Sequence, residues 1–344
     1  MKKVIVIDRD IPYLEGVFEP WFEVRCRPAG EITREVVHDA SALLIRTRTR
    51  CDRRLLAGSR MEFIATATIG FDHIDRAYCT HIGVEWSSAA GSNARAVMQY
   101  VAATLVWLSR KQGWAPGGRT LGVVGVGHVG SIIVELARGL GFRVVCCDPP
   151  RMRAEQGLDF LPFDELLAMA DIVTFHVPLQ REGIDKTFHL ADAAFFEKIR
   201  PGTAIINTSR GEVIENTAFS RAVDSGKISA AILDVWENEP IIDRCLLEKV
   251  ALATPHIAGY SVQGKANASA MAVQALATHF GLPLAEWYPL GAAPQTDGLP
   301  ISWETLCATI GRYYDIAADD RALRSDPAAF EYLRNGYRLR EEYF

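Results

Sequence analysis

Residues 120–130 read TLGVVGVGHVG, and this stretch decides the fold. Gly125, Gly127 and Gly130 stand at the spacing G-x-G-x-x-G, with an apolar run before them and a helical pattern after them. Strand, glycine turn and helix in this order predict a dinucleotide site. The first glycine makes the tight turn, the second lets the backbone approach a pyrophosphate, and the third lets helix and strand pack closely. The N–H groups of the helix's first turn are then expected to face the anion.

The second part of this fingerprint is an acidic residue after the next strand. A predicted strand at residues 142–147 is followed directly by Asp148, which lies 18 residues after Gly130 (148 − 130), near the spacing of about 20 that the motif predicts. A carboxylate there accepts hydrogen bonds from ribose hydroxyls and repels a 2′-phosphate, so it favours NAD over NADP. Arg151 and Arg153 follow closely and leave NADP open as the lesser alternative.

Length and composition are typical of a globular protein. The chain has 344 residues, 49% of them hydrophobic and 23% charged, enough for two domains and a smaller appendage at about 150 residues per domain. The net charge of −5 gives no basic footprint for nucleic acid. No apolar run approaches the roughly 18 residues of a membrane helix, and the start MKKVIVIDRD is typical of a strand rather than a signal peptide. We expect neither a nucleic-acid nor a membrane partner.

The seven cysteines are scattered and form no C-x-x-C pair. Their number is odd, and Cys146 and Cys147 are adjacent within one predicted strand. This usage is typical of reduced thiols in a cytoplasmic protein. The sequence predicts no metal site.

Short apolar runs alternate with helical patterns and define two α/β units. Candidate strands of the first unit are residues 4–7, 22–26, 42–45, 63–66 and 83–86. Those of the second unit are residues 122–125, 144–147, 172–175, 204–207, 230–234 and 250–253. Strands that alternate with helices predict parallel sheets. A long helical pattern at residues 93–108 leads toward the second unit, and another, ending at Phe280, is placed to return the chain to the first.

Three polar side chains follow predicted strands of the second unit. Arg210 stands in NTSRG, Glu239 in DVWENEP and His256 in TPHIAGY, each in the loop after a strand. Ligands of open α/β sheets bind outside the carboxyl ends of the strands. All three side chains are therefore expected at one cleft.

These residue types suit the oxidation of a 2-hydroxy acid. A histidine can take the hydroxyl proton as hydride leaves for a nicotinamide. A carboxylate can orient the imidazole and favour its charged form, and an arginine offers a planar, two-pronged donor to the substrate carboxylate. Each residue alone also fits a surface loop, a turn or a solvated position. Their order on this fold favours the catalytic interpretation.

The ordered set of motifs resembles the D-isomer-specific 2-hydroxyacid dehydrogenases. The likeness covers nearly all of residues 1–285. It rests on IGFDHID at 69–75, GVVGVGHVG at 122–130, NTSRGEVI at 207–214, LDVWENEP at 233–240 and TPHIAG at 254–259. The glycine motif alone is weak evidence, whereas the five segments in this order are specific.

The resemblance implies an α/β fold with an inserted domain. A doubly wound Rossmann NAD-binding domain at residues 93–259 is expected within a flavodoxin-like α/β substrate domain at residues 1–92 and 260–286. A short α+β C-terminal appendage, residues 287–344, is a candidate dimerisation region. The chain ends at Phe344, earlier than the enzymes it resembles. A shortened C-terminal region is therefore expected, and a dimer through the nucleotide domains is the alternative to one through the tail.

The resemblance also implies roles for individual residues. Arg210, Glu239 and His256 match the family's catalytic triad, and Asp234 matches the residue that holds the nicotinamide end of NAD. The other cofactor contacts expected are Gly125, Gly127, His128, Val129, Gly130, Asp148, Val177, Thr208, Ser209 and Gly259.

A narrower likeness points to members that act on a phosphorylated 2-hydroxy acid. It rests on FIATATIGFDH at 63–73, CDPPR at 147–151, HIAGYSVQGKA at 256–266 and the C-terminal tail. It implies substrate contacts at Thr47, Thr68 and Tyr260.

Three arginines offer a candidate phosphate site. Arg46, Arg48 and Arg50 alternate at the end of a predicted strand, so their side chains are expected to share one face and could hold a phosphate. A solvated basic edge explains the three arginines equally well.

The sequence thus predicts a cytoplasmic, homodimeric, NAD-dependent dehydrogenase for a phosphorylated D-2-hydroxy acid. One alternative is a dehydrogenase for 3-phosphoglycerate, glyoxylate or glycerate. The other is a regulatory protein that senses NAD without turnover.

Overall fold

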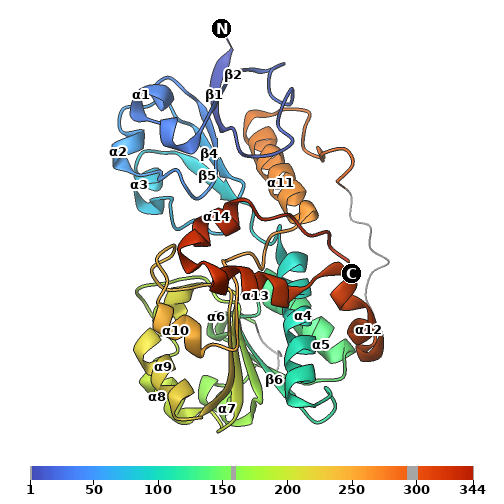
Figure 1. Ribbon diagram of the computed structural model, residues 1–344. Helices are drawn as coiled ribbons and strands as arrows, with labels where there is room; N and C mark the ends of the chain where they lie inside the picture. The colour runs from blue at the N-terminus through green and yellow to red at the C-terminus, as the bar shows by residue number, and fades with distance from the viewer. Residues whose placement is uncertain (1, 156–159, 293–300, 344) are drawn as a thin grey trace. The chain divides into compact units, whose positions relative to one another are not determined.

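The computed structural model describes residues 2–155, 160–292 and 301–343, which form two compact units (Figure 1). The first unit comprises Met1–Asn93 and Ser261–Pro294, and the second comprises Ala94–Tyr260 and Gln295–Phe344. The chain thus leaves the first unit, builds most of the second, returns to the first, and ends in the second.

The first unit contains a five-stranded parallel sheet in the order β2-β1-β3-β4-β5. Its strands are β1 (Lys3–Asp8), β2 (Phe22–Arg27), β3 (Ala42–Ile45), β4 (Phe63–Thr66) and β5 (Glu85–Ser88). Every residue of β3 and β4 is buried, as expected for central strands covered on both faces. The order is that of the flavodoxin-like folds, whose ligands bind where it reverses, here between β1 and β3.

Helices cover both faces of this first sheet. They are α1 (Arg34–Val37), α2 (Arg53–Leu56), α3 (Arg76–His81) and α11 (Val262–Phe280), with a 3₁₀ helix, η1, at Ala29–Glu31. One face packs side chains of α1 to α3, such as Val37 and Leu56, against Val6 and Leu43. On the other face Val273 and Leu276 of α11 pack against the opposite side of the strands.

The second unit contains a six-stranded parallel sheet in the order β11-β10-β9-β8-β6-β7. Its strands are β6 (Thr120–Val124), β7 (Arg143–Cys147), β8 (Ile172–Phe175), β9 (Thr203–Asn207), β10 (Ile228–Leu233) and β11 (Leu252–Ala253). Phe160 adds a single parallel bridge to Cys146 beyond β7. The order reverses at β6, which confirms the doubly wound fold and places the glycine loop at the switch point.

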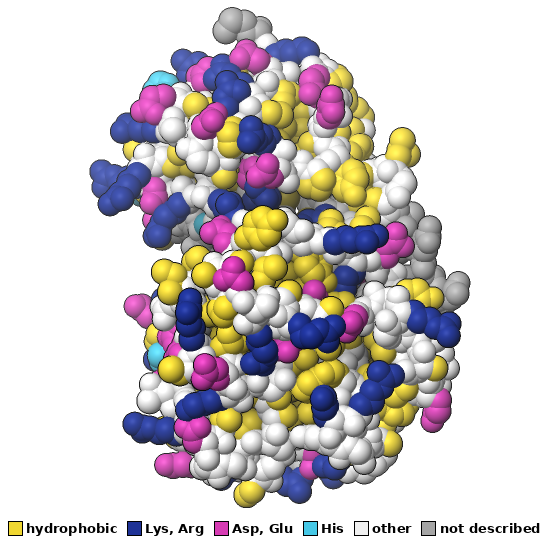
Figure 2. Space-filling view, viewed as in Figure 1, with side chains coloured by type: hydrophobic (Ala, Val, Ile, Leu, Met, Phe, Trp, Pro, Cys, Tyr) yellow, Lys and Arg dark blue, Asp and Glu magenta, His cyan; other side chains and the backbone are white. Residues whose placement is uncertain are grey.

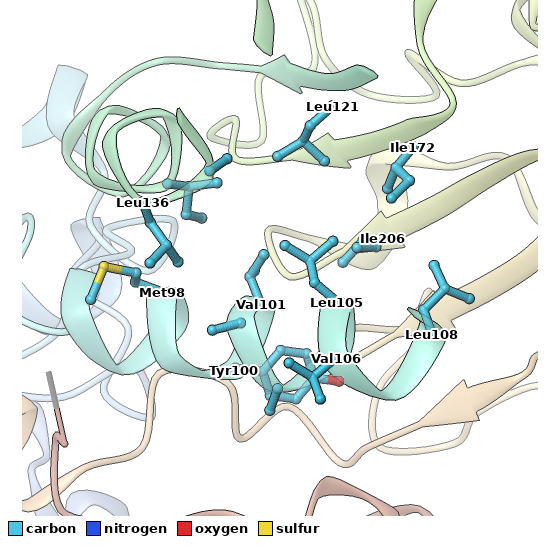
Figure 3. Close-up of a cluster of buried hydrophobic side chains, with 14 of the residues drawn as sticks. Met98, Tyr100, Val101, Leu105, Val106, Leu108, Leu121, Leu136, Ile172 and Ile206 are labelled. Atoms are coloured by element: carbon cyan, nitrogen blue, oxygen red, sulfur yellow. The ribbon is translucent and has the colours of Figure 1, made fainter. Parts of the chain in front are cut away.

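Two apolar layers enclose this second sheet. Val101 and Leu105 of α4 (Ala94–Gln112) face the sheet residues Leu121, Ile172 and Ile206 (Figure 3). The same layer takes in α5 (His128–Gly139). The opposite layer is built on α7 (Phe163–Met169), α8 (Ala193–Lys198), α9 (Asn216–Asp224) and α10 (Arg244–Lys249). The short helix α6 (Pro149–Ala154) follows β7.

The C-terminal region packs on the second unit. Its elements are α12 (Trp303–Tyr313), α13 (Ile316–Ser325), a 3₁₀ helix η3 (Pro327–Ala329) and α14 (Phe330–Asn335). Leu306 and Ile310 join the layer of α4, while Leu323 and Phe330 join the opposite layer. Between residues 301 and 343 the assigned elements are helices, apart from a single β-bridge residue at Arg340, so the expected α+β composition has only that one extended counterpart in this range. The spacing of Leu306 and Ile310 puts both side chains on one helix face.

The surface, the cysteines and the helix lengths each bear on an expectation from the sequence. On the face shown in Figure 2, basic and acidic side chains are interspersed. All seven cysteines are free thiols. Within the described ranges, no helix combines the length and apolar character needed to span a membrane.

Candidate active site

The glycine loop joins β6 to α5. Gly125 has a φ of +85°, which glycine adopts without strain. A Cβ on Gly130 would lie 2.0 Å from the Gly125 carbonyl oxygen, so helix and loop meet where only a hydrogen fits. Nothing lies within 4 Å of the corresponding position at Gly127, and no side chain caps the helix that begins at His128. The loop therefore has the tight packing and the open backbone that a pyrophosphate requires.

Asp148 is fixed beside this loop. Its Oδ2 accepts the Val126 N–H at 2.8 Å and its Oδ1 accepts the Arg151 N–H at 3.1 Å. The carboxylate is thus anchored at the glycine loop rather than merely solvated at a strand end. Arg151 is engaged with Glu155 at 2.7 Å and Arg153 with Asp185 at 2.5 Å. Both guanidinium groups already have carboxylate partners, which favours NAD. The ribose contact of Asp148 stays a prediction.

Other expected cofactor residues lie at neighbouring strand ends. A Cβ on Gly125 would lie 2.7 Å from Val177 Cγ1, so Val177 packs directly on the glycine loop. Thr208 Oγ1 lies 3.3 Å from His176 Nδ1. The Ser209 hydroxyl donates to Asn207 Oδ1 at 2.8 Å and is used within the protein. Gly259 stands in the loop after His256. The cofactor contacts of these residues stay predictions.

His176 is a residue that the sequence did not single out. Its Nε2 lies 2.9 Å from Thr174 Oγ1, and its Nδ1 faces Thr208. Burial lowers the pKa of His176 to about 3, so the imidazole is neutral and one of its nitrogens can accept a hydrogen bond. It therefore links the carboxyl ends of β8 and β9, where cofactor residues are expected.

The central feature of the site is the pair formed by Glu239 and His256. Glu239 Oε2 lies 2.7 Å from His256 Nδ1, and Oε1 accepts the Trp236 N–H at 2.9 Å. An ionised carboxylate only accepts hydrogen bonds, so Nδ1 carries the proton and Nε2 of the neutral ring keeps its lone pair. Burial by itself would raise the pKa of Glu239, but His256, the Trp236 N–H and Arg334 together hold it below its ordinary value. The pair can take up a proton at Nε2.

Asp234 fixes the loop that carries His256. Its carboxylate is 1% exposed and accepts from the Thr254 hydroxyl at 2.6 Å and from the N–H groups of Ile257 and Ala258 at 2.8 and 2.9 Å. Its carbonyl oxygen accepts the His256 N–H at 2.7 Å. Asp234 thus sets the position of the imidazole. Its expected contact with the nicotinamide stays a prediction.

The loop of Arg210 runs against the loop of Glu239. A Cβ on Gly211 would lie 1.9 Å from the carbonyl carbon of Trp236, so the two backbones touch. Asn207 Nδ2 donates to the Arg210 carbonyl at 2.8 Å, and Arg210 Nη1 donates to the Ser209 carbonyl at 2.8 Å. The structure therefore joins Glu239 to His256 directly and brings Arg210 onto the adjoining loop.

The geometric argument for a shared face of Arg46, Arg48 and Arg50 is wrong. β3 ends at Ile45 and the chain turns, so strand alternation no longer applies. Arg46 pairs with Asp8 at 3.0 Å and Asp10 at 2.5 Å, while Arg50 pairs with Asp52 at 3.3 Å. Arg46 does stand at the switch point between β1 and β3.

The other expected substrate residues of the first unit are two threonines. Thr47 is exposed in the turn after β3. The Thr68 hydroxyl lies 2.6 Å from Thr66 Oγ1 and donates to the Gly70 carbonyl at 3.0 Å. Substrate binding by Arg46, Thr47 and Thr68 stays a prediction.

Two arginines of the C-terminal region reach the site, and the sequence did not identify them. Arg334 Nη1 lies 3.4 Å from Glu239 Oε2, and its Nε donates to the Tyr260 hydroxyl at 3.3 Å. Arg340, 6% exposed, donates to the carbonyls of Ile257 and Ala258 at 3.2 and 2.7 Å. The only sequence signal is a tail rich in arginine, which does not say which surface it meets. Across the parts of the chain that the structure describes, no cluster of His, Cys, Asp and Glu could hold a metal ion.

Comparison with known proteins assigns the chain to one family. Residues 89–258 match the family described as D-isomer specific 2-hydroxyacid dehydrogenase, NAD binding domain. The chain belongs to the D-isomer-specific 2-hydroxyacid dehydrogenases, which are NAD-dependent oxidoreductases. Within that family it is 48% identical to a Bacteroides fragilis protein named erythronate-4-phosphate dehydrogenase, over 98% of this chain and 97% of that one. A protein of the same name from Bacteroides thetaiotaomicron is 44% identical, with the same coverage of both chains.

Solved structures show the same fold. The NAD⁺-bound 3-phosphoglycerate dehydrogenase of Entamoeba histolytica superposes with a TM-score of 0.69 at 22% identity. The match covers 82% of this chain and 96% of that one. The sequence matches, by contrast, run through the C-terminal region as well as the two α/β units.

Proposed function

We propose that the protein oxidises 4-phospho-D-erythronate at C2 to 3-hydroxy-2-oxo-4-phosphobutanoate, a step in the biosynthesis of pyridoxal phosphate (vitamin B6). Its relatives named erythronate-4-phosphate dehydrogenase, similar over 98% of the chain, support the substrate. The hydrogen bond of 2.7 Å between Glu239 and His256 carries the chemistry.

His256 acts as the base at the C2 hydroxyl. Glu239 holds Nδ1, so Nε2 accepts the hydroxyl proton and the carboxylate stabilises the resulting imidazolium. Arg210 holds the substrate carboxylate through its planar fork. NAD⁺ held at the glycine loop would supply the acceptor for the hydride from C2. The oxidation would then balance as alcohol and NAD⁺ giving ketone and NADH, with the hydroxyl proton on His256.

The remaining roles follow the same assignment. Residues 1–92 and 260–286 act as the substrate domain, residues 93–259 as the NAD-binding domain, and residues 287–344 as the C-terminal appendage. The residues assigned to substrate are Arg46, Thr47, Thr68 and Tyr260. Those assigned to NAD are Gly125, Gly127, His128, Val129, Gly130, Asp148, Val177, Thr208, Ser209, Asp234 and Gly259.

The substrate is tested with purified protein, NAD and a panel of acids. The panel contains 4-phospho-D-erythronate, D-erythronate without the phosphate, 3-phosphoglycerate and glycerate. We expect nicotinamide reduction to be fastest, by kcat/KM, with 4-phospho-D-erythronate. A higher kcat/KM with any other member would reject the substrate assignment, and binding of NAD without turnover of any acid would reject the enzymatic role.

The role of His256 is tested by His256→Ala. Losing the base should lower kcat by at least about 100-fold, while NAD still binds. His81→Ala, at an exposed helix end of the first unit, is the matched control and should keep the wild-type kcat. An unchanged kcat in His256→Ala would remove this residue from the mechanism.

We further propose a homodimer in the cytoplasm, with no nucleic-acid or membrane partner. The family resemblance supports the dimer and the free cysteines support a reducing compartment. Sedimentation velocity of the purified protein should give twice the monomer mass. A single species at monomer mass across the micromolar range would reject the dimer.

A further inference from the structure

The C-terminal helix α14 delivers a cation to the carboxylate of the proposed acid–base pair. Glu239 Oε2, which lies 2.7 Å from His256 Nδ1, also lies 3.4 Å from Arg334 Nη1. The same guanidinium donates through Nε to the Tyr260 hydroxyl at 3.3 Å. One carboxylate oxygen is therefore shared between an imidazole and a guanidinium.

Arg334 is held in place from both sides. Four residues before it, Phe330 is 1% exposed and packs in the layer of α7 to α10. Six residues after it, Arg340 donates to the carbonyls of Ile257 and Ala258 and stacks 4.2 Å over the Tyr314 ring. The side chains of Arg334 and Glu239 are only 29% and 17% exposed. The contact is therefore not a loose surface pair, whose effect would be small.

Further charged groups lie around the pair. Besides His256 itself, the ionisable groups of the second unit that act most strongly on Glu239 or Arg334 are Asp234 and Tyr260. Asp234 is already satisfied by a hydroxyl and two backbone N–H groups. Burial by itself would lower the pKa of Arg334, but Tyr260 and Glu239 raise it overall, so the guanidinium stays charged. The cation offsets the charge that Glu239 presents to the imidazole.

We propose that Arg334 is a positioning residue that acts through Glu239: it offsets part of the charge that the shared carboxylate oxygen presents to the His256 ring, and so weakens the attraction of Glu239 for a proton on Nε2. This rests on the roles proposed above for Glu239 and His256. Without the cation, the carboxylate would favour the imidazolium more strongly. The C-terminal region then belongs to the active site of the same chain.

The test is the pH profile of kcat/KM for Arg334→Gln, measured with whichever acid of the panel the enzyme turns over. Oxidation needs the unprotonated imidazole, so the acid limb should move to higher pH by about 0.5 to 1 unit. Arg334→Lys, which keeps the charge, should restore the wild-type limb. Arg321→Gln removes an exposed arginine of the neighbouring helix, paired with Asp315, and should leave the profile unchanged.

A purely structural role predicts a different result. Arg334→Gln would then lower kcat/KM equally at every pH, and that outcome would overturn the inference. If Arg334→Gln does not fold, Arg334→Met keeps the apolar stem and should show the same shift. In a Glu239→Gln background the Arg334 substitution should add no further shift, and an undiminished shift there would also overturn the inference. Full activity of His256→Ala would instead defeat the proposed function itself.

Discussion

The two carboxylate oxygens of Glu239 have different partners. Oε1 accepts a hydrogen bond from the Trp236 N–H at 2.9 Å, which fixes the side chain to its own loop. Oε2 accepts a hydrogen bond from His256 Nδ1 at 2.7 Å. Since the carboxylate is only 17% exposed, little water competes for either oxygen. The residue therefore sets both the orientation and the tautomer of the proposed base.

Glu239→Gln tests this arrangement. An amide has one oxygen to accept hydrogen bonds and one nitrogen that donates them, so it cannot accept from both Trp236 and His256. We expect kcat to fall by about 100-fold, with NAD affinity unchanged. Glu237→Gln is a matched control, because Glu237 Oε1 lies 2.9 Å from His189 Nε2 in a second carboxylate–imidazole pair two residues away. An equal loss of kcat in both variants would contradict a special role for Glu239.

This comparison also shows what single residues of the sequence could tell. The loop contains both Glu237 and Glu239, and each has a histidine partner, so residue type alone could not choose between them. The family motif favours Glu239. The three arginines after β3 failed as a face because alternation requires the strand to continue past Ile45. Arg334 was beyond reach, since its contact with Glu239 spans 95 residues of chain.

At the scale of elements, the apolar runs predicted the strands well. β3, β4 and β8 have the expected bounds, because each is a fully buried run that begins directly after a polar residue. β5 was expected at residues 83–86 but spans Glu85–Ser88. Gly83 has a φ of +73° and the Val84 N–H bonds to the Cys79 carbonyl, so the end of α3 takes up these two residues. A β-branched residue can close a helix as well as start a strand.

Two matched variants of the glycine loop distinguish its role in packing from its role in binding NAD. Gly130→Ala would place a Cβ 2.0 Å from the Gly125 carbonyl oxygen, and this overpacking should cost about 1–3 kcal/mol of unfolding free energy. At Gly127 a Cβ meets nothing within 4 Å and φ is −78°, so Gly127→Ala should leave stability within about 0.5 kcal/mol.

The same two variants should differ in cofactor affinity. The new methyl of Gly127→Ala keeps a pyrophosphate from the backbone and should raise the Kd for NAD at least about tenfold, or about 1.4 kcal/mol. Denaturant unfolding and calorimetric titration measure the two effects. Normal NAD affinity with lost stability in Gly127→Ala would contradict the assignment of this loop.

At the scale of the molecule, the sequence predicted two α/β units but not which of them the C-terminal region packs on. The described structure has apolar clusters on both faces of each sheet, and the tail completes two of them. Leu306, Leu323 and Phe330 are each at most 1% exposed against the second unit. The pattern of apolar and charged residues shows that such a segment needs a surface to cover. Which surface it covers depends on shape, which composition does not record.

If the tail is part of the second unit's core, it should share that unit's unfolding transition. NAD at 100 times its Kd should raise the free energy of unfolding for that transition by about 2.7 kcal/mol, since the cofactor binds only the folded form. Phe330→Ala should lower the unfolding free energy of the same transition by about 3–5 kcal/mol. Leu276 lies in the core of the first unit, so Leu276→Ala should lower the unfolding free energy of the first unit's transition by about 2–5 kcal/mol. Scanning calorimetry with and without NAD assigns the transitions, which a two-state treatment would merge. If Phe330→Ala instead lowers the unfolding free energy only of the transition that NAD does not stabilise, the C-terminal region unfolds with the first unit. The packing that is argued to hold Arg334 against Glu239 would then be contradicted.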